Sequence, residues 1–270
     1  MTDSYEATST TREQSDTRVQ LTVEDRVARI VLNNPPLNML STDMLGAISD
    51  AVNAAARHES LCAIVFEPGP KCRAFSAGLS MDDLRAEVAY QMLEAFHQIF
   101  KNLDFHSKPT IAVVPEAALG AGCELAAFCD IVIASEKARF GLPEIKIGVF
   151  PPLACVYFPR MVGYKKAHEM VLTGTLLSAR EAQDAGLVTY VVPDDQLQAR
   201  TNEVLDRLRG LSAAVLETAR RALVEAAGLP VDEGLARVED LYLNQLMNLK
   251  DPGEGLVAFL EKRAPHWKHR

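Results

Sequence analysis

Glu124 and Glu144 are the two acidic residues whose surroundings point to a chemical role. Glu124 closes the glycine-rich stretch "LGAGCE" (119–124) and is followed by the apolar run "LAAFCDIVIA". Backbone N–H groups at a helix start are free to bind developing negative charge, and a carboxylate one turn along can act on the same substrate. The alternative is a glutamate that only matches the positive end of the helix dipole. Glu144, in "LPEI", has the alternative of an exposed carboxylate in a loop.

The gross composition describes a globular chain with an acidic surface. Its 270 residues are 48% hydrophobic, with a mean hydropathy of +0.01, which is ample for one sizeable core. The net charge is −8 and the pI is about 5.3, so a general basic surface for nucleic acid is not expected. An anionic ligand would need a local basic pocket.

The cysteine pattern and the N-terminus predict the cellular setting. The five cysteines are odd in number and form no CxxC pair, which favours reduced thiols over a zinc site or a disulfide framework. No apolar run reaches the ~18 residues of a membrane span. Residues 1–18 are polar, rich in Ser and Thr, and lack the apolar core of a signal peptide. We expect a disordered tail over 1–18, a cytoplasmic protein and no membrane partner.

The elements that must position the glutamates follow from hydrophobic patterning. Residues 19–24 and 26–32 alternate apolar and polar and predict a β-hairpin, and Ser41 is a good N-cap for a helix over 42–57. From about 60 to 192, buried strands alternate with helices, as in parallel β units with helical crossovers. After Pro193 the pattern is almost wholly helical. The other expected elements are strands at 61–68, 110–114 and 130–135, and helices at 82–104, 121–128, 153–162, 195–209, 212–227, 231–249 and 253–262.

Five stretches, in order along the chain, resemble one known family. The chain is similar to the crotonase superfamily, the enoyl-CoA hydratases and isomerases, over roughly residues 19–270. A glycine-rich turn before a helix is common by itself, but the whole set in this order and at this spacing is specific. The matching stretches are "NPPLNML" (34–40), "AFSAGLSMDDL" (74–84), "ALGAGCELAAFCDIVIAS" (118–135), "FGLPEIKIGVFPP" (140–152) and "AFLEKRAPHWK" (258–268).

This resemblance implies a fold and an assembly. The fold is α/β, a crotonase-like spiral of repeated ββα units followed by a C-terminal helical trimerisation region. We therefore expect a tail over 1–18, a spiral core with the active site over 19–195, and the helical region over 196–270. Members of this family associate as trimers that often pair into hexamers, so a homotrimer or hexamer is expected.

The resemblance also assigns the reacting groups. The backbone N–H groups of Leu79 and Ala121 would form the oxyanion hole that holds the thioester oxygen as it becomes an enolate. Glu124 and Glu144 match the glutamates that flank the double bond in hydratases. Water addition needs a base for the water and a proton for the adjacent carbon, and two carboxylates around one water can supply both. We expect Glu124 to activate the water and Glu144 to hold it and donate the proton.

Acyl-CoA is the expected ligand, with CoA entering only as part of the substrate and with no other cofactor and no metal. Ala74, Ser76 and Ala77 would approach the CoA through backbone groups. Phe259 and Lys262 match positions that reach the nucleotide part of CoA from a neighbouring subunit, although a solvated lysine at a helix end is an equal alternative for Lys262. The complete substrate-binding set is Ala74, Ser76, Ala77, Gly78, Gly120, Pro152, Phe259 and Lys262.

The segment "GVFPPLACVYFPRMVG" (148–163) departs from common hydratases, which carry more glycine there. Pro152 stiffens the turn, and we expect Phe150, Leu153 and Tyr157 to make an apolar, aromatic wall around the acyl end. A flat ring would suit such a wall. This variation resembles the cyclohexa-1,5-diene-1-carbonyl-CoA hydratases, which add water to a cyclic dienoyl-CoA.

Several alternatives stay open at this point. The leading expectation is a hydro-lyase that adds water to an enoyl-CoA, and the runner-up is an isomerase or a C–C hydrolase on the same scaffold. A non-catalytic binder of acyl-CoA or of RNA is a further class, although the acidic net charge argues against RNA. His97 lies on a helix that faces the substrate in this family and either lines the pocket or is a structural histidine. Asp82 and Asp83 are expected to cap the helix that follows them.

Overall fold

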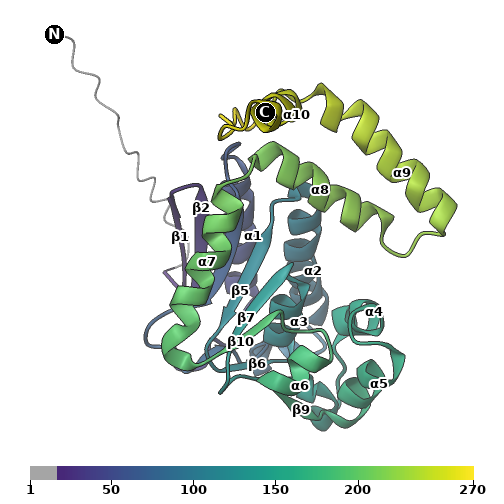
Figure 1. Ribbon diagram of the computed structural model, residues 1–270. Coiled ribbons are helices and arrows are strands. Elements are labelled where there is room, and N and C mark those ends of the chain that lie inside the picture. Colours follow the sequence, from purple (N-terminus) through teal and green to yellow (C-terminus); the bar gives the residue numbers. More distant parts are fainter. Residues whose placement is uncertain (1–16) are drawn as a thin grey trace.

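The computed structural model describes residues 17–270 and shows two β-sheets with helices packed around them (Figure 1). The larger sheet has six strands in the order β1-β2-β3-β5-β7-β10, and the smaller has four in the order β4-β6-β8-β9. The expected tail over 1–18 lies almost entirely outside the described residues. The strands are β1 (Val19–Glu24), β2 (Val27–Leu32), β3 (Ala63–Pro68), β4 (Ala74–Ser76), β5 (Thr110–Val114), β6 (Ala117–Leu119), β7 (Ile131–Ser135), β8 (Arg139–Gly141), β9 (Leu176–Ser178) and β10 (Tyr190–Val192).

The predicted hairpin and the predicted spiral are both confirmed. β1 pairs with β2 antiparallel, and β2, β3, β5, β7 and β10 continue the sheet in parallel. Each of β3, β5 and β7 is followed by a short strand that crosses to the smaller sheet, namely β4, β6 and β8. The chain then passes through a helix before it returns to the larger sheet. This repeat of two strands and a helix is the ββα unit that the resemblance implies.

Parallel strands covered on both faces carry near-continuous apolar runs. β5 is buried at every position, and β3 is buried over its first four residues. One large core cluster lies between this sheet and the helices α1 (Thr42–Ala56), α2 (Ala89–His106) and α3 (Ala121–Phe128). A second cluster lies on the other face of the sheet, where α7 packs (Figure 1). The remaining helices are α4 (Pro152–Met161), α5 (Tyr164–Thr173), α6 (Ala179–Asp184), α7 (Leu197–Arg209), α8 (Ala213–Ala226), α9 (Val231–Asn244) and α10 (Asp251–Glu261), with 3-10 turns η1 (Met81–Leu84), η2 (Pro143–Ile147), η3 (Asp194–Gln196) and η4 (Leu246–Asn248).

The helix expected over 82–104 is divided in the structure. The 3-10 turn η1 ends before Arg85, whose extended backbone (φ −71°, ψ 145°) interrupts the helix, and α2 begins only at Ala89. Asp83 was expected to cap the helix that follows it, and this prediction is also wrong. Its Oδ2 accepts a hydrogen bond from the backbone N–H of Thr42 at 3.1 Å, so it caps α1, together with the predicted cap Ser41. The acid therefore ties the loop after β4 to the start of α1.

The C-terminal part of the chain is helical, as expected. α9 ends at Asn244 and is followed by the separate turn η4, whereas the sequence pattern predicts one helix over 231–249. Figure 1 shows α9 and α10 projecting away from the two sheets. Many large apolar side chains of these helices are exposed, among them Leu235, Leu243, Leu256, Phe259 and Leu260. Within residues 17–270, no helix combines the length and apolar character needed to cross a bilayer.

Candidate active site

Two backbone amides at the predicted oxyanion positions are free of internal acceptors. Leu79 forms a parallel bridge with Leu40, in which Leu40 N donates to Gly78 O (2.9 Å) and Ser80 N donates to Leu40 O (2.8 Å). The flanking groups make the bridge, so the Leu79 N–H points away from it. Ala121 is the first residue of α3, where the N–H has no intrahelical partner. Within the described residues neither amide donates a hydrogen bond.

Glycine allows these two amides to lie close together. Gly78 has φ +100°, a backbone conformation that residues with a side chain rarely adopt. A Cβ on Gly78 would lie 3.1 Å from the carbonyl oxygen of Leu119 and 3.6 Å from the nitrogen of Ala121. The loop before Leu79 is therefore in close contact with the start of α3. The arrangement can direct two N–H groups at one oxygen atom that gains negative charge.

Asn38 is a structural residue of the site that the sequence analysis missed. It is fully buried, and its Nδ2 donates to the carbonyl oxygens of Ala74 (3.3 Å) and Phe75 (3.0 Å). Its own carbonyl oxygen accepts from the Ser76 hydroxyl (2.7 Å), whose Oγ in turn accepts from Gly78 N (3.1 Å). This network fixes the loop that carries the Leu79 amide. The only sequence signal is that an asparagine stands two residues after the proline pair.

Glu124 is held in the interior by a backbone amide from a distant helix. Its side chain lies in the first turn of α3, and the residue is only 2% exposed. Oε1 accepts a hydrogen bond from the N–H of Ala154, in the first turn of α4, at 2.7 Å. Burial raises the pKa of Glu124 to about 8; the charge of Glu144 adds to the rise, and the Ala154 hydrogen bond opposes it. The carboxyl group is thus inclined to hold a proton near neutral pH.

Glu144 lies against the start of the same helix. It belongs to η2, and its carboxylate touches Gly120 so closely that a Cβ there would overlap with Oε1. Its Oε2 is buried and has no hydrogen-bond partner among the described residues. Burial raises the pKa of this carboxyl group as well. Because Gly120 directly precedes Ala121, the second acid lies beside the Ala121 amide, one of the two predicted oxyanion donors.

The structure gathers part of the predicted set and leaves part of it elsewhere. Leu79, Gly78, Gly120, Ala121, Glu124 and Glu144 come together, and Pro152 begins α4, two residues before the amide that binds Glu124. Ala74 and Ser76 are buried, and the Ala77 N–H already donates to Leu37 O (2.9 Å). Phe259 and Lys262 lie at the end of α10, far from α3 and α4 in Figure 1, and Phe259 is 80% exposed. Within one chain, α10 does not reach the glutamates.

The wall beside Glu124 is only partly the one expected. Leu153 and Tyr157 are half-buried on α4 and pack against the core, and the Tyr157 ring meets Phe128 edge-on with centroids 5.0 Å apart. Phe150, which was expected to complete the wall, is 59% exposed. The segment before α4 therefore leaves this side chain at the surface of the chain.

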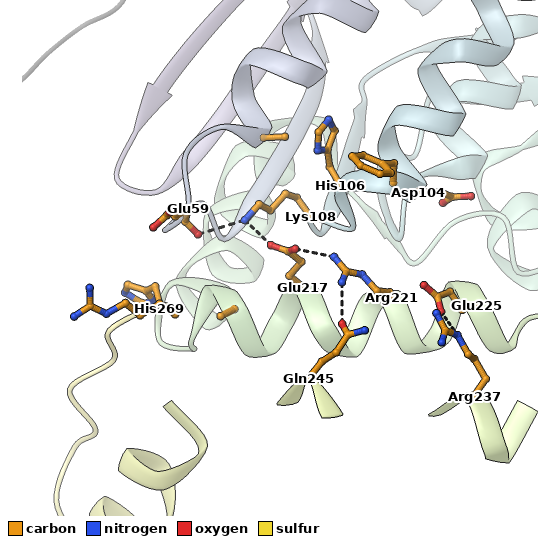
Figure 2. Close-up of a pocket in the computed structure, with 14 residues that line it drawn as sticks. Glu59, Asp104, His106, Lys108, Glu217, Arg221, Glu225, Arg237, Gln245 and His269 are labelled. Carbon is orange, nitrogen blue, oxygen red and sulfur yellow. Dashed lines mark hydrogen bonds and ion pairs between the residues drawn. The ribbon is translucent and has the colours of Figure 1, made fainter. Parts of the chain in front are cut away.

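A cavity of about 700 Å³ elsewhere in the chain contains none of the predicted site residues. It lies between α8, α9 and the end of α2 (Figure 2). Its charged side chains pair with one another: Lys108 with Glu217 at 2.8 Å, and Arg221 with Glu217 at 3.0 Å. Arg221 also donates to the side chain of Gln245. Among residues 17–270, no group of three or more His, Cys, Asp or Glu side chains is arranged to hold a metal ion.

The two-sheet spiral of ββα units defines the crotonase fold class. The chain belongs to the enoyl-CoA hydratase/isomerase family, whose model matches residues 22–270. An Escherichia coli (strain K12) protein named 2,3-dehydroadipyl-CoA hydratase is 35% identical over 250 residues, which cover 92% of this chain and 97% of that protein. A Dictyostelium discoideum protein named probable enoyl-CoA hydratase, mitochondrial, is 36% identical over 252 residues (91% and 88%). The crystal structure of an enoyl-CoA hydratase subunit from Geobacillus kaustophilus matches with a TM-score of 0.86 at 32% identity, over 94% of this chain and 99% of that one.

Proposed function

We propose that this protein is an enoyl-CoA hydratase that adds water across the double bond of an α,β-unsaturated acyl-CoA thioester. The observation that carries the proposal is the position of two acids, the buried Glu124 and the half-buried Glu144, near the Leu79 and Ala121 amides, which donate no hydrogen bond within the described residues. Family membership and the names of the relatives support the same reaction class. Two neighbouring carboxyl groups whose pKa values are raised by burial support a functional site, because burial of an ionisable group costs free energy.

In the proposed mechanism the thioester oxygen lies between the N–H groups of Leu79 and Ala121. When water attacks the β-carbon, the electrons of the double bond move onto that oxygen and form an enolate, which the two amides stabilise. Removal of one such donor typically costs about 3–4 kcal/mol of transition-state stabilisation. Glu124 takes a proton from the attacking water, and Glu144 gives a proton to the α-carbon. After the two transfers Glu124 carries a proton and Glu144 is ionised. Passage of one proton from Glu124 to Glu144 restores the starting state.

The raised pKa values suit a pair of carboxyl groups that shares one proton. The pair must carry one proton and one negative charge before water attacks, and raised pKa values favour such a half-protonated state near neutral pH. The proton belongs to the pair as a unit, since the two groups interact. The Ala154 N–H stabilises the charged form of Glu124, which is the form needed for base catalysis.

The acyl group is the finer part of the proposal. A cyclic dienoyl group, as in cyclohexa-1,5-diene-1-carbonyl-CoA, is supported by Pro152 at the start of α4 and by the half-buried Leu153 and Tyr157. The exposure of Phe150 weakens the case for a closed aromatic wall. The name of the Escherichia coli relative adds a second candidate, an open-chain group that ends in a carboxylate.

We further propose that the active chain is a homotrimer or a hexamer. The exposed apolar side chains of α9 and α10 offer a surface for another copy. In such an assembly Phe259 and Lys262 would meet the CoA bound by a neighbouring subunit. This explains why they match CoA-binding positions of the family although α10 lies far from α3 in its own chain.

The test is a hydration assay with purified protein, followed by ultraviolet absorbance and mass spectrometry. The substrates are crotonyl-CoA, cyclohexa-1,5-diene-1-carbonyl-CoA and 2,3-dehydroadipyl-CoA. We expect the gain of one water, slowed at least ~100-fold in Glu124→Gln and in Glu144→Gln, because each variant removes one proton-transfer partner. A faster reaction of the cyclic diene than of crotonyl-CoA supports the cyclic acyl group.

Other outcomes of this assay contradict the proposal in different ways. A shifted double bond without gain of mass indicates an isomerase, and release of a shorter acyl fragment indicates a C–C hydrolase. Tight binding of crotonyl-CoA or its saturated analogue without any turnover indicates a binding protein. Equal rates of wild-type protein and both glutamine variants remove the glutamates from the mechanism.

A further inference from the structure

We propose that His97 recognises a carboxylate at the far end of the acyl group, so that the substrate is the mono-CoA thioester of an unsaturated dicarboxylic acid. The inference rests on the proposed function and narrows its substrate class. It starts from an unused polar atom: Nε2 of His97 is buried and has no hydrogen-bond partner among the residues that the structure describes. A buried polar group without a partner costs about 1–3 kcal/mol, and a ligand can recover that free energy.

His97 lies on a half-buried face of α2. Leu93, His97, Phe100 and Asp104 follow the spacing of one helical face. Leu93 is half-buried and packs against the main core. At the other end of this face, Asp104 forms an ion pair with Arg220 of α8. Phe100 is buried and the other three residues are half-buried, so this face lies beside the fully buried stripe of α2 that packs on α1.

Aromatic contacts connect this face to the two helices that hold Glu124. The Phe100 ring meets Phe128 at 4.8 Å between centroids, and Phe128 meets Tyr157 at 5.0 Å. Phe128 ends α3, one turn after Glu124, and Tyr157 lies on α4, one turn after Ala154. His97 lies one turn before Phe100, whose ring contacts α3, on the same face of α2. In the proposal, its buried nitrogen meets the acyl end of a substrate held beside Glu124.

The charges around His97 favour an anionic group. Burial and the nearby positive charge of Lys101 lower the pKa of His97, so its ring is neutral near pH 7 and presents one N–H donor. Lys101 lies one turn further along α2. A carboxylate would accept the imidazole N–H and lie in the field of the ammonium group, whereas a hydrocarbon ring would leave the donor unpaired. The carboxylate therefore competes with the cyclic dienoyl group as the acyl end.

The experiment uses two substrates of equal length, 2,3-dehydroadipyl-CoA and trans-2-hexenoyl-CoA, which differ only in a terminal carboxylate or methyl group. We expect the wild-type protein to prefer the dicarboxylic substrate in kcat/KM. His97→Leu should reduce the ratio of the two kcat/KM values about 10- to 100-fold, which corresponds to a hydrogen bond to a charged group. His97→Gln, which keeps an N–H donor, should retain part of the preference.

His106→Leu is the matched control, because it is the same substitution on the same helix. His106 Nε2 pairs with Asn53 Oδ1 at 2.9 Å and does not lie on the face of His97. It should leave the substrate ratio unchanged, and thermal melting should show that all variants fold. An equal ratio in wild type and His97→Leu, or a wild-type preference for hexenoyl-CoA, overturns the proposal.

A failure of the proposed function is distinguishable from a failure of this inference. If wild-type protein hydrates neither substrate, the reaction is wrong, and calorimetry with the saturated ligands adipyl-CoA and hexanoyl-CoA then tests His97 alone. Tighter binding of adipyl-CoA by wild type, lost in His97→Leu, supports recognition of the carboxylate. Equal binding of the two ligands by wild-type protein overturns it.

Discussion

At the scale of single residues, the protonation of Glu124 links chemistry to stability. A glutamate in an unfolded chain titrates near pH 4.3, whereas burial raises the pKa of Glu124 in the folded chain to about 8. The folded protein therefore holds this proton more tightly than the unfolded chain. The stabilisation is fully present below the unfolded pKa and is lost as the pH rises through the folded pKa.

We predict that the free energy of unfolding of the wild-type protein falls between about pH 4.5 and pH 8, and that Glu124→Gln removes most of this fall. A shift of this size corresponds to roughly 5 kcal/mol, since each pKa unit is worth about 1.4 kcal/mol. Urea denaturation of both proteins at a series of pH values measures the difference. Glu94→Gln, at an exposed position of α2, serves as the control and should keep the wild-type pH profile. Parallel profiles for wild type and Glu124→Gln would contradict the burial of an ionisable group at this position.

Individual residues differ in how far the sequence could reveal them. Glu124 is recognisable because it follows a glycine-rich turn, and Ser41 because it precedes an apolar helix pattern. Asn38 and Ala154 act through contacts with residues far away in the chain, and no local sequence pattern predicts those partners. The same holds for Asp83, whose bond to Thr42 depends on how the loop packs against α1.

At the scale of elements, the start of α3 depends on a glycine that leaves room for an acid. Gly120 has φ +54°, and a Cβ there would meet the Glu144 carboxylate. The turn therefore fixes both the direction of the helix and the place of the second acid. The proline and glycine pattern predicts such elements well, while the break between η1 and α2 comes from a backbone change at Arg85 that the continuous apolar spacing hides.

We predict that Gly120→Ala slows hydration at least ~10-fold and destabilises the fold by about 1–3 kcal/mol, because the new methyl group displaces Glu144 and strains the backbone. Gly46→Ala is the matched control: it lies inside α1 with nothing within 4 Å of the added Cβ. That change should stabilise the protein by roughly 0.5–1 kcal/mol and leave the rate unchanged. Measurements of kcat and of urea midpoints decide both cases. Unchanged kcat in Gly120→Ala would show that Glu144 does not need its observed position.

At the scale of the whole molecule, the spiral and the helical tail have different surfaces. The sheets are enclosed by helices, while α9 and α10 expose apolar side chains that one chain does not cover. The sequence predicts the helical nature of this region, but the directions in which α9 and α10 project follow from short connections and long-range packing. Those directions decide which residues are available to another copy.

We predict that the combined change Leu243→Glu and Leu260→Glu lowers the particle mass toward the 29.6 kDa of one chain, because two charges would be buried at the interface. The wild-type protein should have three or six times that mass by light scattering. Leu172→Glu, at a leucine of α5 that is equally exposed (63%, as for Leu243), is the control and should keep the assembly. The KM for acyl-CoA should rise in the combined variant if Phe259 and Lys262 serve a neighbouring site. A wild-type mass of one chain would contradict the assembly.

The hydrogen bond from Ala154 to Glu124 has a consequence for how such a protein can change over evolutionary time. Like the Leu79 and Ala121 donors, it is a main-chain group, and every amino acid except proline supplies it. Under the proposed mechanism, substitutions at these three positions would change the side chains while the N–H groups assigned to the reaction are retained. A descendant protein could then differ in these side chains and keep the proposed chemistry.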